Sequence, residues 1–223
     1  MAKESKNVPQ EQVAEAVSKT DLFFKENRKT ILIASGAIVL CVLLILGYTH
    51  FIRTPKVNEC RAQMFPAEHA FQQGDYQTAF SGDGNILGFE EILSTYGSFA
   101  DESAWLYAGI CQLQLGEYES AISYLKKYKG KEPILSARAQ ACLGDAYVGL
   151  QQYAEAAAQF EKAAGVSDNV FAAEYLLKAA VAYEELGDKD KALKLYETIK
   201  DKYPQSIEGY DIDKYINRIK IAE

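Results

Sequence analysis

One pattern of small and aromatic residues recurs three times in the second half of the chain, at a spacing of about 35 residues. Gly109, Gly144 and Ala180 mark the three copies, at intervals of 35 and 36 residues. The same residue types follow each of them at the same distances. The recurring positions are Gln112, Tyr147 and Tyr183; Gly116, Gln151 and Gly187; Tyr118, Tyr153 and Lys189; Ala121, Ala156 and Ala192; and Leu125, Phe160 and Tyr196. A period of this length is typical of stacked repeat units.

The residue types at these positions predict a pair of antiparallel helices in each copy. A small residue such as Gly109 lets a partner helix cross closely, and Gly116 and Gly187 supply the turn that reverses the chain. Pro133 and Pro204 end the first and third copies, because proline cannot continue a helix. Neither helix could bury its apolar stripe alone, so neighbouring hairpins are expected to stack.

This pattern resembles the tetratricopeptide repeat over residues 102–204. The matching residues are Trp105, Ala108, Gly109, Gly116, Tyr118, Ala121, Leu125 and Pro133 in the first copy, Leu143, Gly144, Tyr147, Tyr153, Ala156, Phe160 and Ala163 in the second, and Ala179, Ala180, Tyr183, Gly187, Ala192, Tyr196 and Pro204 in the third. The resemblance implies an all-α fold, a solenoid of helical hairpins that binds a peptide or a partner protein.

A degenerate copy precedes these three, with Ala67, Gly74, Tyr76 and Ala79 in the right relative places. Gly109 follows Ala67 by 42 residues, so an insertion is expected around residues 81–88. This segment is glycine-rich and lacks the acidic spacing of a calcium loop, which favours a turn that interrupts the hairpin.

A final amphipathic segment from Tyr210 to Ile221 has Ile212, Tyr215, Ile216 and Ile219 on one face. It is expected to be a helix that caps the solenoid.

A stretch of 23 residues from Thr30 to Ile52 carries no formal charge. As a helix it would extend about 35 Å, enough to cross a hydrocarbon core of about 30 Å. A tail of mixed charge precedes it and no Ala-x-Ala-like exit follows, so it does not resemble a cleaved signal peptide. Leu40 before Cys41 argues against a lipoprotein acylated at that cysteine. We therefore expect an uncleaved transmembrane helix.

Within about 15 residues of this span, four basic residues precede it and three follow it, which favours a cytoplasmic amino-terminal tail. The repeat domain would then lie across the membrane. The tail itself has Val13, Val17, Thr20 and Phe24 at helical spacing, a pattern that fits either an amphipathic helix on the membrane surface or a solvated tail.

The expected organisation has seven parts. They are a cytoplasmic tail (1–29), a transmembrane helix (30–52), a degenerate first repeat with an insertion (53–101), three repeats (102–136, 137–172 and 173–208) and a capping helix (209–223).

Several classes of function find no support in the sequence. Residues 53–223 carry 18 basic and 26 acidic side chains, a balance that argues against a nucleic-acid-binding surface. Neither His50 nor His69 lies near a second histidine or a cysteine, so we expect no metal or other cofactor. No nucleophile elbow, phosphate-binding loop or His-Glu-x-x-His motif appears, and we expect no enzyme. Cys60, just beyond the span, is the one cysteine suspected of an intermolecular disulfide.

The family resemblance also implies a partner-binding face formed by the first helix of each unit. The corresponding positions are Leu106, Ile110, Leu113, Arg138, Asp145, Val148, Lys178, Val181 and Glu184. The carboxylate-clamping lysine and asparagine of one branch of the family are replaced here by Leu106 and Ile110, which argues against an acidic peptide tail as ligand. Those two residues could instead pack against the preceding hairpin.

A short tail, one anchor and a small repeat domain together resemble the ancillary subunit of the bacterial Sec translocon, as does the segment from Phe23 to Lys29. This resemblance implies a single-pass protein of the inner membrane with a periplasmic repeat domain, and translocon subunits and a membrane-bound periplasmic chaperone as partners. Two alternatives stay open, a structural assembly factor for cell-envelope or division complexes and a cytosolic domain as in organelle import receptors. Both a monomer and a homo-oligomer fit the sequence.

Overall fold

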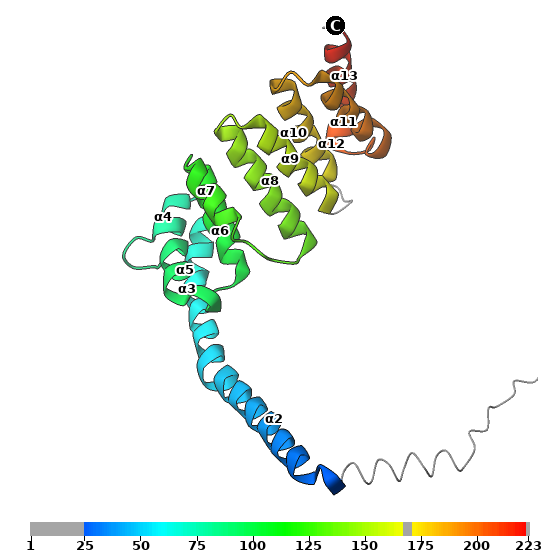
Figure 1. Cartoon of the computed structure of the whole chain (residues 1–223). Helices are drawn as coiled ribbons and strands as arrows, with labels where there is room; N and C mark the ends of the chain where they lie inside the picture. Colours follow the sequence, from blue (N-terminus) through cyan, green and yellow to red (C-terminus); the bar gives the residue numbers. More distant parts are fainter. Residues whose placement is uncertain (1–24, 167–170, 222–223) are drawn as a thin grey trace, which may run out of the picture. The chain divides into compact units, whose positions relative to one another are not determined.

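The computed structural model describes residues 25–166 and 171–221, and every regular element in those ranges is a helix (Figure 1). The expected all-α fold is therefore confirmed. The chain divides into two compact units, residues 1–55 and residues 56–223. The amphipathic pattern of the tail falls on residues 1–24, outside the described part of the chain.

In the first unit, α2 (Arg28–Tyr48) continues into a π-helical turn, η1 (Thr49–Arg53). No side chain from residue 25 to residue 55 is buried. The helix that begins at Arg28 is the one helix among the described residues with the length and composition to cross a membrane. The π-turn comes just before Pro55, which lacks the N–H that would continue α-helical hydrogen bonding. The Thr54 hydroxyl donates to the Thr49 carbonyl across this turn, at 2.8 Å.

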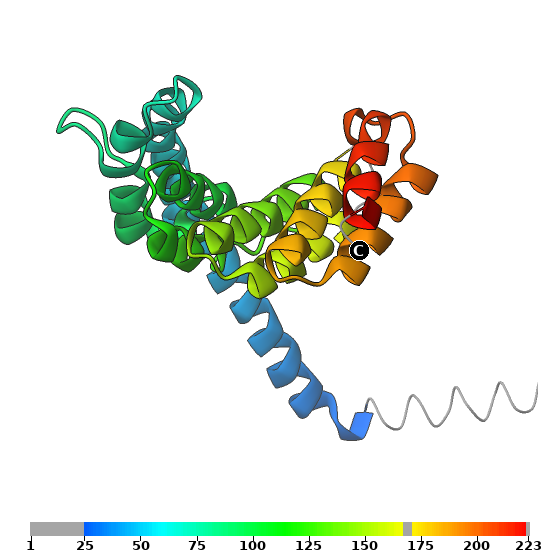
Figure 2. The ribbon, with the colours of Figure 1, turned by 90° about the horizontal axis from the view of Figure 1, so that it is seen from above.

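The second unit is built from antiparallel helix pairs, and from residue 76 onward consecutive helices pack on one another along the chain (Figures 1 and 2). The pairs are α3 (Thr54–Gln72) with α4 (Tyr76–Ser81) and α5 (Phe89–Tyr96); α6 (Glu102–Gln114) with α7 (Tyr118–Leu125); α8 (Pro133–Gly149) with α9 (Tyr153–Val166); and α10 (Ala172–Glu185) with α11 (Lys189–Lys202). A 3₁₀ turn, η2 (Gly97–Phe99), precedes α6, and α12 (Ile207–Tyr210) and α13 (Ile212–Ile221) end the described chain.

The turn inside each pair contains one residue in the left-handed conformation. Gly74, Gly116 and Gly187 have φ angles of 78°, 81° and 76°. Gln151 occupies the equivalent place in the α8–α9 turn, with a φ of 59°. Glycine adopts this conformation without steric cost and glutamine does not, which explains the glycine at the other three turns. The predicted role of Gly116 and Gly187 is confirmed.

The recurring small residues lie where the two helices of a pair approach most closely. A Cβ atom added to Gly109 would lie 2.5 Å from Cγ of Leu125, and one added to Gly144 would lie 2.5 Å from the ring of Phe160. The partner is the residue sixteen positions further on in both copies. The period in the sequence therefore reflects a repeated contact between a small residue and a large one.

A loop from Gly82 to Gly88 separates α4 from α5, within the segment where the insertion was expected (Figure 1). The loop is closed at its base, because a Cβ on Gly88 would lie 2.1 Å from the Phe80 carbonyl oxygen and 2.4 Å from the Gly82 nitrogen. The Asp83 carboxylate accepts from the backbone N–H of Asn85 and of Ile86, at 2.8 and 3.0 Å. α4 and α5, with six and eight residues, thus act as one second helix interrupted by a loop.

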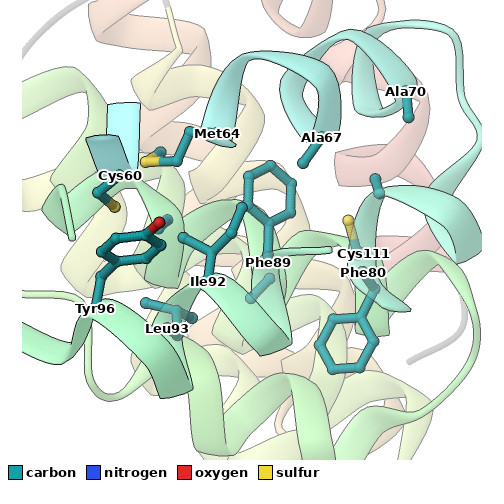
Figure 3. Close-up of a cluster of buried hydrophobic side chains, with 13 residues drawn as sticks. Cys60, Met64, Ala67, Ala70, Phe80, Phe89, Ile92, Leu93, Tyr96 and Cys111 are labelled. Atoms are coloured by element: carbon teal, nitrogen blue, oxygen red, sulfur yellow. The ribbon is translucent and has the colours of Figure 1, made fainter. Parts of the chain in front are cut away.

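The first helix pair packs around an apolar core that it shares with α6 (Figure 3). Phe89 and Ile92 of α5 are fully buried and pack with Met64 and Ala67 of α3. Cys60 belongs to the same core and is 0% exposed. Burial of this thiol argues against the suspected intermolecular disulfide at Cys60.

The end of the solenoid is covered by α13. Ile212, Ile216 and Ile219 are buried in one cluster with Tyr196 and Ile199 of α11. These three isoleucines form the predicted apolar face. Without α13 the last hairpin would expose its apolar side to water.

Candidate functional site

A groove of about 400 Å³ runs between α8 and α10 and is bordered by α9 and α13. Four of the nine residues predicted for partner binding line it, namely Asp145, Val148, Lys178 and Val181. The remaining lining residues are Tyr153, Phe160, Leu177, Ala182, Glu185 and Tyr215. The volume falls in the range of about 300–1,000 Å³ that is typical of ligand sites.

The walls of the groove are apolar and open to solvent. Val148 on α8 and Val181 on α10 are each 39% exposed, whereas Phe160 and Ala182 are buried. Tyr215 of α13 is partly buried and contributes a wall from the capping helix. The capping helix therefore both closes the core and completes the groove.

The one ammonium group that lines the groove is already paired with carboxylates. Lys178 Nζ lies 3.0 and 3.1 Å from the two carboxylate oxygens of Asp145, and 3.5 Å from an oxygen of Glu174. The same ammonium lies 5.7 Å from the centre of the Phe160 ring. Glu185 is exposed and has no ion-pair or hydrogen-bond partner among residues 25–166 and 171–221. The charge around the groove is therefore net negative.

Glu184 was predicted for the binding face, but it has a structural role. Its carboxylate accepts from the Tyr196 hydroxyl of α11, and from Arg218 Nη2 of α13 at 2.7 and 2.9 Å. Burial, followed by the hydrogen bond to Glu184, raises the pKa of Tyr196. Glu184 thus joins three helices, while its neighbour Glu185 lines the groove.

The structure also corrects the prediction that Leu106 and Ile110 belong to the partner-binding face. They are only 2% and 8% exposed and pack in one cluster with residues of α8, such as Cys142 and Leu143. They offer no surface to a partner, and they pack against the following hairpin as well as their own. Leu113 is partly buried against the same cluster.

Arg138 is exposed on α8 and does not line the groove. Sequence reasoning also missed two residues with a clear role in the groove, Glu185 and Tyr215. Glu185 lies one turn beyond Val181 on the same helix face, a signal available in the sequence. Tyr215 comes from the cap, and no repeat pattern points to it.

Within the described residues, no group of three or more histidine, cysteine or acidic side chains is placed to hold a metal ion. Burial raises the pKa of Cys111 to about 12 and that of Cys142 to about 11. Both thiols are therefore protonated at neutral pH and are poor nucleophiles.

Comparisons with known proteins agree with this architecture. Two segments match tetratricopeptide-repeat family models, residues 103–133 and residues 143–207. One crystal structure of MamA has 21% sequence identity to this chain and a TM-score of 0.54, over 70% of this chain and 88% of that one. A second has 22% identity and a TM-score of 0.58, over 72% and 82%. No curated protein matches the chain significantly.

At this level of identity, the likeness to MamA concerns the fold alone. Residues 103–133 and 143–207 are thus similar to tetratricopeptide repeats, and they lie within an all-helical solenoid.

Proposed function

We propose that this chain is a membrane-anchored scaffold that binds protein or peptide partners through the groove between α8 and α10. Tetratricopeptide repeats are interaction modules, and the groove is where this solenoid leaves apolar side chains uncovered between two first helices of its repeats. The exposure of Val148 and Val181 is the observation that carries the proposal. Apolar side chains lining a concave surface gain free energy when a partner covers them.

The proposed anchor is α2. Its leucine, isoleucine and valine side chains are largely exposed, for example Leu43 at 60% and Leu44 at 65%. Exposure of so many apolar side chains in water is unfavourable, at about 25 cal/mol for each Å². A bilayer removes this cost because lipid tails replace the water around these side chains. A helix also satisfies its own backbone hydrogen bonds in lipid.

The cellular setting of the proposal is the bacterial inner membrane, with the tail in the cytoplasm and the repeat domain in the periplasm. There the scaffold would assist protein translocation or chaperoning, beside Sec translocon subunits and a membrane-bound chaperone. The excess of basic residues before the span and the resemblance of the tail, anchor and domain order support this setting.

The proposal is tested by photo-crosslinking in intact membranes. A photoreactive amino acid replaces Val181, and the matched control replaces Ile134, which is 50% exposed but lies outside the groove. We expect Val181 to capture translocon subunits, a chaperone or a chain in transit, and Ile134 to capture none of these. Crosslinks from Val181 to cell-wall or division proteins would instead support the alternative function, a structural assembly factor for cell-envelope or division complexes. Equal yields at both positions would contradict a binding role for the groove.

A further inference from the structure

We propose that the groove selects a peptide segment in which an aliphatic side chain lies one or two positions from a lysine or arginine. This inference rests on the proposed function, because it names the chemistry of the partner at that same groove. It follows from the order of apolar and acidic side chains along α10.

The apolar part of the site is formed by Val148 and Val181, which face the groove from α8 and α10. Phe160 and Ala182 lie beneath them. An aliphatic side chain can fill this space and remove the two valines from water. A polar side chain there would lose hydrogen bonds to water and find no replacement on these surfaces.

The acidic part of the site begins one helical turn further along α10. Glu185 follows Val181 by four residues, so the two side chains are neighbours on the same face, about 5–6 Å apart between their Cβ atoms. An extended peptide advances about 3.3 Å for each residue. A cation one or two positions from the buried aliphatic side chain therefore comes within reach of the Glu185 carboxylate.

The charges around the groove favour a cation over an anion. An acidic peptide in the groove would have to pair with the Lys178 ammonium. The charge of this ammonium is already offset by Asp145 at 3.0 Å and by Glu174 at 3.5 Å. An anion would have to compete with both carboxylates. Glu185 carries an unpaired charge within the described part of the chain, and residues 53–223 have a net negative charge that attracts cationic partners at a distance.

The test compares three fluorescein-labelled peptides that differ at two positions. The first has the core Leu-Lys-Leu-Lys-Leu between Gly-Ser ends, and the others carry Glu or Gln in place of Lys. The full chain is reconstituted in nanodiscs of neutral phosphatidylcholine, so that the cationic peptide is not attracted to anionic lipid. Binding is measured by fluorescence anisotropy, with empty nanodiscs as the blank.

We expect the cationic peptide to bind at least about tenfold more tightly than the acidic one, with the neutral peptide between them. Glu185→Lys should weaken binding of the cationic peptide at least about fivefold and should strengthen binding of the acidic one. Glu155→Lys is the matched control, since Glu155 is exposed on α9 outside the groove. Val181→Asn should weaken the binding of all three peptides, whereas Ile134→Asn should change the affinity for none of them.

The possible outcomes separate this inference from the proposed function. If the three peptides bound with equal affinity and Val181→Asn weakened the binding of all three, the preference for a cation would be overturned. The groove would remain a binding site. If no peptide bound while Val181 still captured proteins in membranes, the inference would fail and the scaffold would stand. Failure of both experiments would overturn both.

Discussion

At the scale of single residues, glycine is used in two distinct ways in this chain. Gly116 and Gly187 supply backbone conformations, whereas Gly109 and Gly144 supply space. The space beside Gly144 is filled by the ring of Phe160, which is 1% exposed. A side chain at Gly144 would therefore have to displace the Phe160 ring or move the two helices of the repeat apart.

Gly144→Ala is expected to lower the free energy of unfolding by about 1–3 kcal/mol, the usual cost of overpacking a core. Gly165 provides the matched control, because a Cβ there meets nothing within 4 Å. Gly165→Ala should be neutral or stabilising by up to about 1 kcal/mol, since alanine is the better helix former. Urea unfolding followed by circular dichroism measures both, and equal effects of the two substitutions would show that the close contact has no energetic role.

Tyr196 predicts how stability depends on pH. It is 0% exposed, and its pKa is raised by burial and by its hydrogen bond to Glu184. Above pH of about 10 an unfolded tyrosine loses its proton while the folded one keeps it. The folded state then binds more protons, so the free energy of unfolding falls as the pH rises, by up to about 1.4 kcal/mol for each pH unit.

Other groups, including lysines, also titrate in this range, so the prediction concerns the difference between two proteins. Between pH 9 and about 11, the free energy of unfolding of Tyr196→Phe should fall less steeply with pH than that of the wild type. It should cost about 1 kcal/mol at neutral pH through the lost hydrogen bond. Parallel curves for the two proteins would contradict a protonated, buried Tyr196.

At the scale of elements, the loop from Gly82 to Gly88 is an addition to an otherwise regular hairpin. The buried residues on either side of it are Ala79 and Phe80 in α4, and Phe89 and Ile92 in α5. If residues 82–88 were absent, Phe89 would come three positions after Ala79, and Ile92 would come six positions after Ala79. At about 100° for each residue, Ala79, Phe89 and Ile92 would then lie within about 120° of one another on a continuous helix, and Phe80 would lie about 100° to the other side of Ala79.

Deletion of residues 82–88 is therefore expected to leave a cooperatively folded domain, with thermal stability unchanged or slightly raised because a shorter loop costs less entropy. Gly88→Ala should be more damaging than the whole deletion, since its Cβ would meet the Phe80 carbonyl oxygen at 2.1 Å. Thermal unfolding followed by circular dichroism compares the two variants. Loss of cooperative unfolding in the deletion alone would show that α4 and α5 do not form one interrupted helix.

At the scale of the whole molecule, the burial of its cysteines makes the proposed topology measurable. Cys60, Cys111 and Cys142 are buried and free, and burial raises the pKa of all three thiols. Cys41 lies in α2, within the proposed bilayer span. Since thiolates are the reactive species, the native protein should give almost no background with a water-soluble maleimide.

Ser123→Cys places a thiol on an exposed position of α7. A membrane-impermeant maleimide is expected to label this variant in intact cells with a permeabilised outer membrane, and to leave the wild type unlabelled until it is denatured. Labelling only after lysis would place the repeat domain in the cytosol. Release of the protein from membranes by alkaline carbonate would contradict the anchor itself.

Much of the fold was predictable from the sequence because its main signals are local and repeated. The spacing of Gly109 and Gly144, the glycines of the turns and the apolar face of the cap each follow from contacts within a hairpin or between neighbouring ones. Such contacts depend on helix geometry alone, so residue type and spacing are enough to predict them.

The identity of the groove residues was decided by tertiary packing. Leu106 and Ile110 of α6 are buried against α8, whereas Val148 of α8 and Val181 of α10 remain exposed, although the family pattern placed all four on one face. How far a first helix is covered depends on how the next hairpin packs on it. Likewise, Arg218 of α13 takes Glu184 out of the groove and leaves Glu185 there. These choices depend on how closely each hairpin and the cap cover the helix before them, which differs from copy to copy, so no period in the sequence encodes them.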